Sequence, residues 1–68
     1  MIRLRVEREK LKLSQSRLAA LTGTVHPSSI SQIETGKRKP GYKQRDLIEK
    51  AMIAAGWLGN NDLFEEVN

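Results

Sequence analysis

Glycine and proline divide this chain into segments of helix length, and that punctuation constrains the fold more than any other feature. Gly23, Gly36 and Gly56 each follow a segment whose apolar residues recur three or four positions apart. Glycine often ends a helix because it readily adopts the left-handed backbone conformation that closes one. No segment alternates β-branched and polar residues in the manner of a strand. The pattern therefore predicts an all-helical (all-α) protein.

Capping residues and apolar spacing locate the ends of five predicted helices. Ser14 suits the N-cap of the second helix. Pro27 suits the first turn of the third helix, because the N–H that proline lacks is not needed there, and His26 would then occupy the N-cap position. The predicted helices span residues 2–12, 15–22, 27–35, 43–55 and 61–66.

The apolar faces of the predicted helices indicate one shared core. The 3–4 spacing predicts that the following residues are buried together: Leu18, Ile30, Ile33, Leu47, Ile48 and Ala51. Trp57 follows Gly56 at a position where contact back to the preceding helix is common. Four apolar residues near the C-terminus either complete the core or form a small two-fold contact: Leu58, Leu63, Phe64 and Val67. The core is favoured, because so short a chain needs every apolar group.

Composition excludes several classes of protein. The length of 68 residues predicts one domain, residues 1–68, and the absence of cysteine excludes disulfides and thiolate metal sites. The single histidine, His26, cannot form a metal site alone, and we expect no cofactor. No apolar run approaches the roughly 18 residues of a membrane span, and the N-terminus lacks the apolar stretch of a signal peptide. We therefore expect a cytoplasmic protein with no membrane partner.

Charge is distributed unevenly along the chain, whose net charge is +4. Residues 1–45 carry eleven Lys and Arg against three acidic residues, whereas residues 46–68 carry one Lys against five acidic residues. An excess of basic residues in the first two-thirds of the chain suits a polyanionic partner such as nucleic acid. A solvated charged surface is the competing interpretation, and charge alone does not exclude it.

The predicted third helix presents an unusual outward face. The side chains that point away from Ile30 and Ile33 are Ser28, Ser31, Gln32 and Thr35. Short polar side chains with both donors and acceptors suit the edges of DNA bases. Three cations follow at residues 37–39, where a phosphate backbone would run beside the groove. These features favour DNA binding over the alternative of a polar surface helix followed by a solubilising turn.

The residues around that helix resemble a known family. The run ISQIETGKRKP at residues 30–40, together with Leu13-Ser14-Gln15, Leu18-Ala19 and Gly23, resembles the XRE family, the phage-repressor/Cro type of helix-turn-helix. The resemblance extends from Leu4 through the fourth helix, and DLFEEV at residues 62–67 resembles the end of many small members. It implies a compact, lambda-repressor-like bundle of five helices that binds double-stranded DNA as a transcriptional regulator. The third helix would lie in the major groove.

The resemblance also implies roles for individual residues. The residues implied to face bases or the groove edge are Ser28, Ser29 and Gln32. Those implied to contact phosphates are Gln15, Lys37, Arg38 and Lys39, with Gln15 helped by the N-terminus of its helix. Arg8 and Glu34 would form a structural ion pair between the first helix and the end of the third. The competing interpretations are helix-start chemistry for the two serines and ordinary surface side chains for the others.

Two features depart from the family's usual pattern. Gly23 and Gly36 lie one residue farther apart than usual, and Thr24 looks like the insertion. Pro27 stands where many relatives have a polar residue that reads a base, and proline offers no donor there, so it can contribute only shape or an apolar contact. The extra residue would either tilt the third helix or lengthen the turn before it.

An enzymatic, a membrane-surface and a protein-interaction role are the alternatives to DNA binding. An enzyme is disfavoured, because no acid near His26 would orient it toward the neighbouring serines and no oxyanion-hole motif is present. A membrane-surface role for the first helix is disfavoured because that helix lacks aromatic anchors. A protein-interaction module, or an antitoxin-type regulator built on the same fold, remains the main alternative. A homodimer on a palindromic operator stays open.

Overall fold

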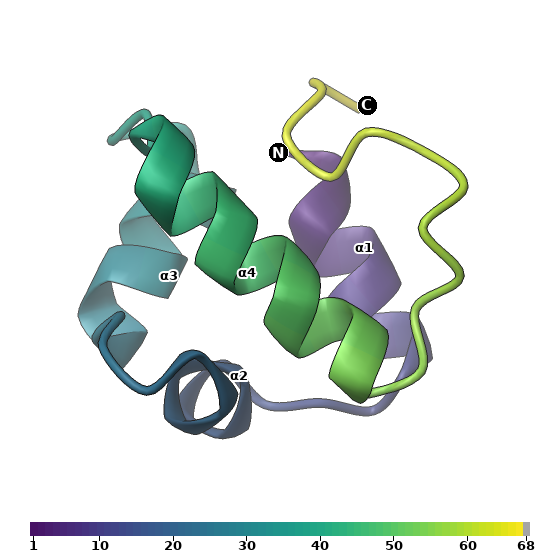
Figure 1. Ribbon diagram of the computed structural model, residues 1–68. Helices are drawn as coiled ribbons and strands as arrows, with labels where there is room; N and C mark the ends of the chain where they lie inside the picture. Colours follow the sequence, from purple (N-terminus) through teal and green to yellow (C-terminus); the bar gives the residue numbers. More distant parts are fainter. Residues whose placement is uncertain (68) are drawn as a thin grey trace.

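The computed structural model describes residues 1–67, and within them the chain forms four helices (Figure 1). The helices are α1 (Arg3–Lys10), α2 (Gln15–Thr22), α3 (Pro27–Glu34) and α4 (Tyr42–Ala54). α2 packs against both α3 and α4, and α1 packs against α3. The described part of the chain contains no strand, only an isolated antiparallel bridge between Ile2 and Glu66. The prediction of an all-helical protein is therefore confirmed.

Local capping explains most of the helix ends. The Ser14 hydroxyl accepts from the backbone N–H of Arg17 at 3.0 Å, so it caps α2 as predicted. α4 is followed by Gly56 with φ of +115°, and the N–H of Trp57 returns to the carbonyl of Met52 at 2.9 Å. α1 is shorter than predicted, because Lys12 has a left-handed φ of 55°. Helix stops that depend on glycine are thus easier to predict than one at lysine.

One apolar core lies between the four helices. Its buried members are Ile2, Leu4, Leu18, Ala19, Val25, Ile30, Ile33, Ile48, Ala51, Met52, Trp57 and Leu63. Five of the six residues predicted to share the core are in it, and the sixth, Leu47, is half-buried at its edge. Leu21 is 44% exposed, because α2 turns Leu18, Ala19 and Thr22 inward instead. The inner face of α3 packs against the core, and the outer face of α3 is exposed to solvent.

The predicted fifth helix is wrong. Residues 61–67 form turns, in which the Asp62 carboxylate accepts from the N–H of Phe64 at 3.0 Å. The backbone of this segment instead caps α1, whose N-cap residue Ile2 offers no side-chain acceptor. The N–H of Arg3 donates to the carbonyl of Glu65 at 3.0 Å, and the N–H of Leu4 donates to that of Leu63 at 2.7 Å.

This capping explains why the segment is not helical. The first N–H groups of a helix have no acceptor within the helix and need one from outside. Helical geometry in the last segment would direct its own carbonyls along the chain and away from α1. The first residues and the last described residues consequently lie side by side, as Figure 1 shows at its top, and the N–H of Val67 donates to the carbonyl oxygen of Met1 at 2.9 Å. Leu63 completes the core, whereas Leu58 is 85% exposed.

The turn between α2 and α3, in which the sequence suggests one inserted residue, is held by its own contacts. The Thr22 hydroxyl donates to the carbonyl of Ala19 at 2.6 Å and accepts from the N–H of Val25 at 3.0 Å. Val25 is buried, while Thr24, the residue that looks like the insertion, is exposed. The turn is therefore a solvent-facing bend between two anchored residues.

Candidate nucleic-acid interface

The start of α3 is organised by its capping histidine. His26 is the N-cap, as predicted, and its Nδ1 accepts from the backbone N–H of Ser28 at 3.2 Å. Pro27 occupies the first turn, where its lack of an N–H costs nothing. The Ser28 hydroxyl lies 2.9 Å from the same Nδ1. The first polar side chain of the helix is thus held by a local contact instead of rotating freely.

The hydrogen bonds around Ser28 determine which role its hydroxyl can play. An imidazole nitrogen that accepts from a backbone N–H carries no proton of its own. In the tautomer in which Nδ1 accepts from that N–H, the Ser28 hydroxyl donates to Nδ1. The lone pairs of the Ser28 oxygen then remain for a further partner, and Ser28 acts toward solvent as an acceptor.

Ser29 has a different hydrogen-bond partner. The Arg38 guanidinium reaches back from the loop after α3 and donates from Nη1 to the Ser29 hydroxyl oxygen at 3.2 Å. An oxygen that accepts from arginine keeps its own hydrogen and a second lone pair, so the Ser29 hydroxyl can still both donate and accept. Neither contact with His26 nor contact with Arg38 is evident from the sequence pattern alone, although both residues are near the serines in the chain.

The remaining residues of the outward face differ in how available they are. Gln32 is exposed, and its amide carries both donors and an acceptor. Thr35 is exposed too, but its hydroxyl donates to the backbone carbonyls of Ser31 and Gln32. Ser31 is half-buried. Of the predicted outward residues, Gln32 is therefore the one with a fully available polar group.

The loop that follows α3 brings its three cations close to that face. Gly36 has φ of +82°, and the N–H groups of Lys37 and Arg38 both return to the carbonyl of Gln32, at 2.9 and 3.3 Å. Lys37, Arg38 and Lys39 are all exposed. This close folding of the loop against the helix end sets the cations beside the polar side chains of α3.

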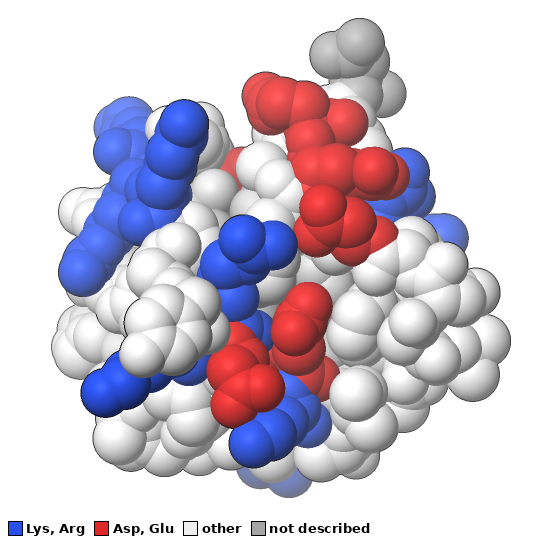
Figure 2. Space-filling model, turned by 45° about the horizontal axis from the view of Figure 1, so that its top comes forward, with Lys and Arg blue, Asp and Glu red and all other residues white. Residues whose placement is uncertain are grey.

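The charges of the molecule are separated in space as well as along the chain. Figure 2 shows Lys and Arg gathered at the upper left, over the loop between α3 and α4, and Asp and Glu gathered at the upper right, over the C-terminal segment. The acids of that segment pair with groups near the N-terminus: Glu65 with Arg3, and Glu66 with the Met1 ammonium. Within residues 1–67, the three loop cations form no ion pair.

Arg8 and Glu34 come together in a bidentate ion pair that joins α1 to the last turn of α3. Arg8 donates from Nε to Glu34 Oε2 at 2.7 Å and from Nη2 to Oε1 at 3.0 Å, and Glu34 is 1% exposed. The third nitrogen, Nη1, donates to the carbonyl of Leu13 at 2.7 Å. The hydrogen bonds that Arg8 donates to Glu34 raise the pKa of Arg8, although burial acts in the opposite direction. The pair therefore ties α1 to the last turn of α3.

Gln15 has a contact that the sequence does not predict. Its side-chain Nε2 donates to Glu34 Oε1 at 3.0 Å, so the amide nitrogen is engaged inside the protein. The side-chain oxygen and the backbone N–H at the start of α2 are the groups that remain for a phosphate. No spacing rule reveals this contact, because Gln15 and Glu34 lie on different helices that meet only in the folded chain.

Two other features, a metal site and a membrane-spanning helix, were considered next to the surface of α3. Among residues 1–67, no group of three or more His, Asp or Glu side chains is arranged to hold a metal ion. None of the helices described is long and apolar enough to cross a membrane. The arrangement around α3, with a polar outer face, a flanking cationic loop and a buried anchor, is the most developed surface for a partner.

Comparison with known proteins bears on the same segment. A family model described as helix-turn-helix matches residues 4–52, a stretch that contains all of α2 and α3 and most of α1 and α4. No curated protein and no solved structure matches the chain. The matched stretch includes every residue that the sequence predicts for DNA contact or for the ion pair.

Proposed function

The chain belongs to the XRE family of helix-turn-helix domains, which are DNA-binding transcription regulators, and on that premise we propose that it binds specific sequences of double-stranded DNA, with α3 in the major groove. In this role it would act as a cytoplasmic regulator of transcription. The observation that carries the proposal is the outer face of α3, where Ser28, Ser29 and Gln32 lie next to the cations of residues 37–39.

The polarity of the two serines supports a more specific proposal about base selection. Ser28, held as an acceptor by His26, would suit the exocyclic amino groups of adenine or cytosine. Ser29 keeps its hydrogen when Arg38 donates to its oxygen, so it could donate to the N7 and O6 of guanine, the N7 of adenine or the O4 of thymine, in addition to accepting. Ser28 would then be limited to base donors, whereas Ser29 would not.

This difference predicts the outcome of alanine substitution at the two serines. Ser28→Ala and Ser29→Ala are each expected to weaken binding to the preferred duplex by about 1 kcal/mol, the usual contribution of one neutral hydrogen bond. Each should relax the preference at a different base pair. Selection of bound sequences by each variant checks this, and loss of preference at the same base pair would contradict the assignment.

Lys37 is predicted to contribute to binding without contributing to selectivity. Lys37→Ala should weaken binding to all duplexes alike and lower the slope of log affinity against log salt by about one unit, because one phosphate contact is lost. Titrations of a preferred and a random duplex at several salt concentrations measure both effects. Lys50→Ala is the matched control, since Lys50 lies on α4 and pairs with Asp46 at 3.0 Å. A change restricted to the preferred duplex would show that Lys37 reads bases instead.

We also propose that two copies bind a palindromic operator, because a single small module has a limited DNA interface. Exposed apolar side chains at Ile53 and Leu58, which are 57% and 85% exposed, offer surface for such a contact. Selection of bound sequences from a random duplex pool tests both proposals in one experiment. A palindromic motif is expected. If no duplex binds at low salt, the function is wrong and a protein-interaction role becomes the better explanation.

A further inference from the structure

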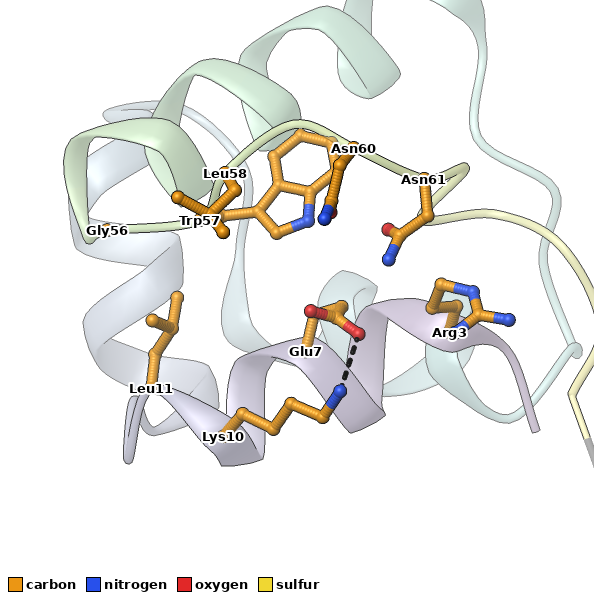
Figure 3. A pocket seen from close by; sticks show the side chains of 9 residues that line it. All are labelled: Arg3, Glu7, Lys10, Leu11, Gly56, Trp57, Leu58, Asn60 and Asn61. Atoms are coloured by element: carbon orange, nitrogen blue, oxygen red, sulfur yellow. Dashed lines mark hydrogen bonds and ion pairs between the residues drawn. The ribbon is translucent and has the colours of Figure 1, made fainter.

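A pocket of about 320 Å³ lies between α1 and the segment that follows α4. Its lining comes from α1, from Leu11 directly after it and from residues 56–61, and includes no residue of α2 or α3 (Figure 3). The volume is at the lower end of the range for small-molecule sites, roughly 300–1,000 Å³. The pocket is therefore separate from the proposed DNA surface and has room for a small ligand.

Two buried polar atoms of this pocket have no partner. The indole Nε1 of Trp57 is a donor and the side-chain oxygen of Asn61 is an acceptor, and no atom of residues 1–67 forms a hydrogen bond with either. Trp57 is 8% exposed. Buried polar groups are nearly always paired, because an unpaired one costs about 1–3 kcal/mol. A donor and an acceptor unpaired in the same pocket indicate that a partner from outside the chain supplies both contacts.

Glu7 contributes a carboxylate with few hydrogen bonds to the same pocket. It is 8% exposed, and the one hydrogen bond that the described residues give its side chain comes from Lys10 at 3.3 Å. An ionised carboxylate can accept about four hydrogen bonds. In Figure 3 the Glu7 carboxylate, the Trp57 nitrogen and the Asn61 amide all point toward the space between α1 and the segment above it.

We propose that this pocket binds a free α-amino acid. The ammonium group of the ligand would donate to the Glu7 carboxylate and the Asn61 oxygen, which together match its positive charge and its several donors. The ligand carboxylate would accept from Trp57 Nε1 and lie near the cations Lys10 and Arg3 at the edge of the pocket. Leu11 and Leu58 supply the apolar surface for a side chain. The proposal does not depend on DNA binding.

Trp57 makes the proposal directly measurable, because it is the only tryptophan of the chain. Glycine, L-alanine and L-leucine are titrated into the protein while its fluorescence is recorded, with methylammonium chloride and sodium acetate as probes that carry only one of the two charged groups. A saturable change with at least one amino acid, and a rise in the thermal midpoint at saturation, are expected. The single-charge probes should bind at least tenfold more weakly.

Two variants test the contacts. Glu7→Gln keeps the shape of the side chain but removes its charge, and it should weaken amino-acid binding about 10- to 100-fold. Asn61→Leu removes the acceptor at similar volume and should weaken binding while leaving stability equal or higher, since it replaces an unpaired polar group. Glu9→Gln is the matched control, an exposed acid of α1 that does not line the pocket.

The outcomes that overturn the proposal are distinct. If none of the amino acids changes fluorescence or thermal midpoint, the pocket is merely hydrated. If acetate or methylammonium binds as tightly as glycine, the pocket does not recognise the paired charges of an amino acid. If Glu7→Gln does not fold, Asn61→Leu decides, and undiminished binding by Asn61→Leu overturns the assigned contact. None of these results bears on the proposed DNA binding, which is tested separately by duplex titration.

Discussion

Glu34→Ala is expected to lower the free energy of unfolding by about 3–5 kcal/mol, the largest effect of any substitution considered for this protein. The substitution leaves the Arg8 guanidinium without its bidentate acceptor and the Gln15 amide without its partner. Glu34 is almost completely buried, so water cannot replace the lost contacts. A domain of this size has a total stability of only about 3–10 kcal/mol, so the loss is a large share of it.

Urea unfolding followed by circular dichroism measures this effect. Glu9→Ala is the matched control, because Glu9 pairs with Arg5 at 3.3 Å on the exposed side of α1, where such a pair contributes about 0–1 kcal/mol. Glu34→Gln should fall between the two, since it keeps one acceptor for Arg8. If Glu34→Ala is no more destabilising than Glu9→Ala, the buried pair does not stabilise the fold.

Gln32→Ala is expected to weaken binding to the preferred duplex by about 1–3 kcal/mol and to relax selectivity at one base pair. The Gln32 side chain is exposed and can present a donor and an acceptor together, the arrangement that pairs with adenine in the major groove. Its backbone carbonyl holds the loop after α3, but alanine retains that carbonyl. The substitution should therefore change base recognition without disturbing the loop.

Titration of the preferred duplex and of a scrambled duplex separates base recognition from contact with the phosphate backbone. The scrambled duplex should bind Gln32→Ala and the parent protein almost equally, in contrast to Lys37→Ala, which should weaken both. Asn60→Ala serves as the control for removing an exposed amide elsewhere. Equal loss on both duplexes would show that Gln32 contacts only the backbone, and no loss on either would show that α3 is not the reading helix.

The ends of α2 and α3 and most of the core could be predicted from the sequence because they depend on short-range rules. Ser14, His26 and Pro27 act on helix ends within three residues of themselves. The spacing of Ile30 and Ile33 similarly indicates which face of α3 is inward. The outward face, with Ser28 and Gln32, follows from the same periodicity. The ion pair between Arg8 and Glu34 is implied only by the family resemblance, since the two residues are far apart in sequence and no short-range rule relates them.

Other features were decided by the tertiary structure. Residues 61–66 have helical apolar spacing, yet their backbone carbonyls are taken by the first N–H groups of α1, which lie some sixty residues away in sequence. Gln15 is at the start of a helix, where the family resemblance implies a phosphate contact, yet its amide nitrogen donates to Glu34. The hydrogen-bonding groups that Ser28 and Ser29 leave free depend on which neighbour each hydroxyl contacts.

The sequence by itself therefore determined where the chain forms α2, α3 and α4, which faces of these helices are apolar and which segment resembles a DNA-reading helix. The tertiary structure alone decided how unpaired groups at the helix ends were satisfied, because an N–H or a carboxylate bonds to whatever the folded chain brings within about 3 Å, regardless of distance in sequence. The pocket beside Trp57 follows from the same principle, since neither α1 nor residues 56–61 forms it alone.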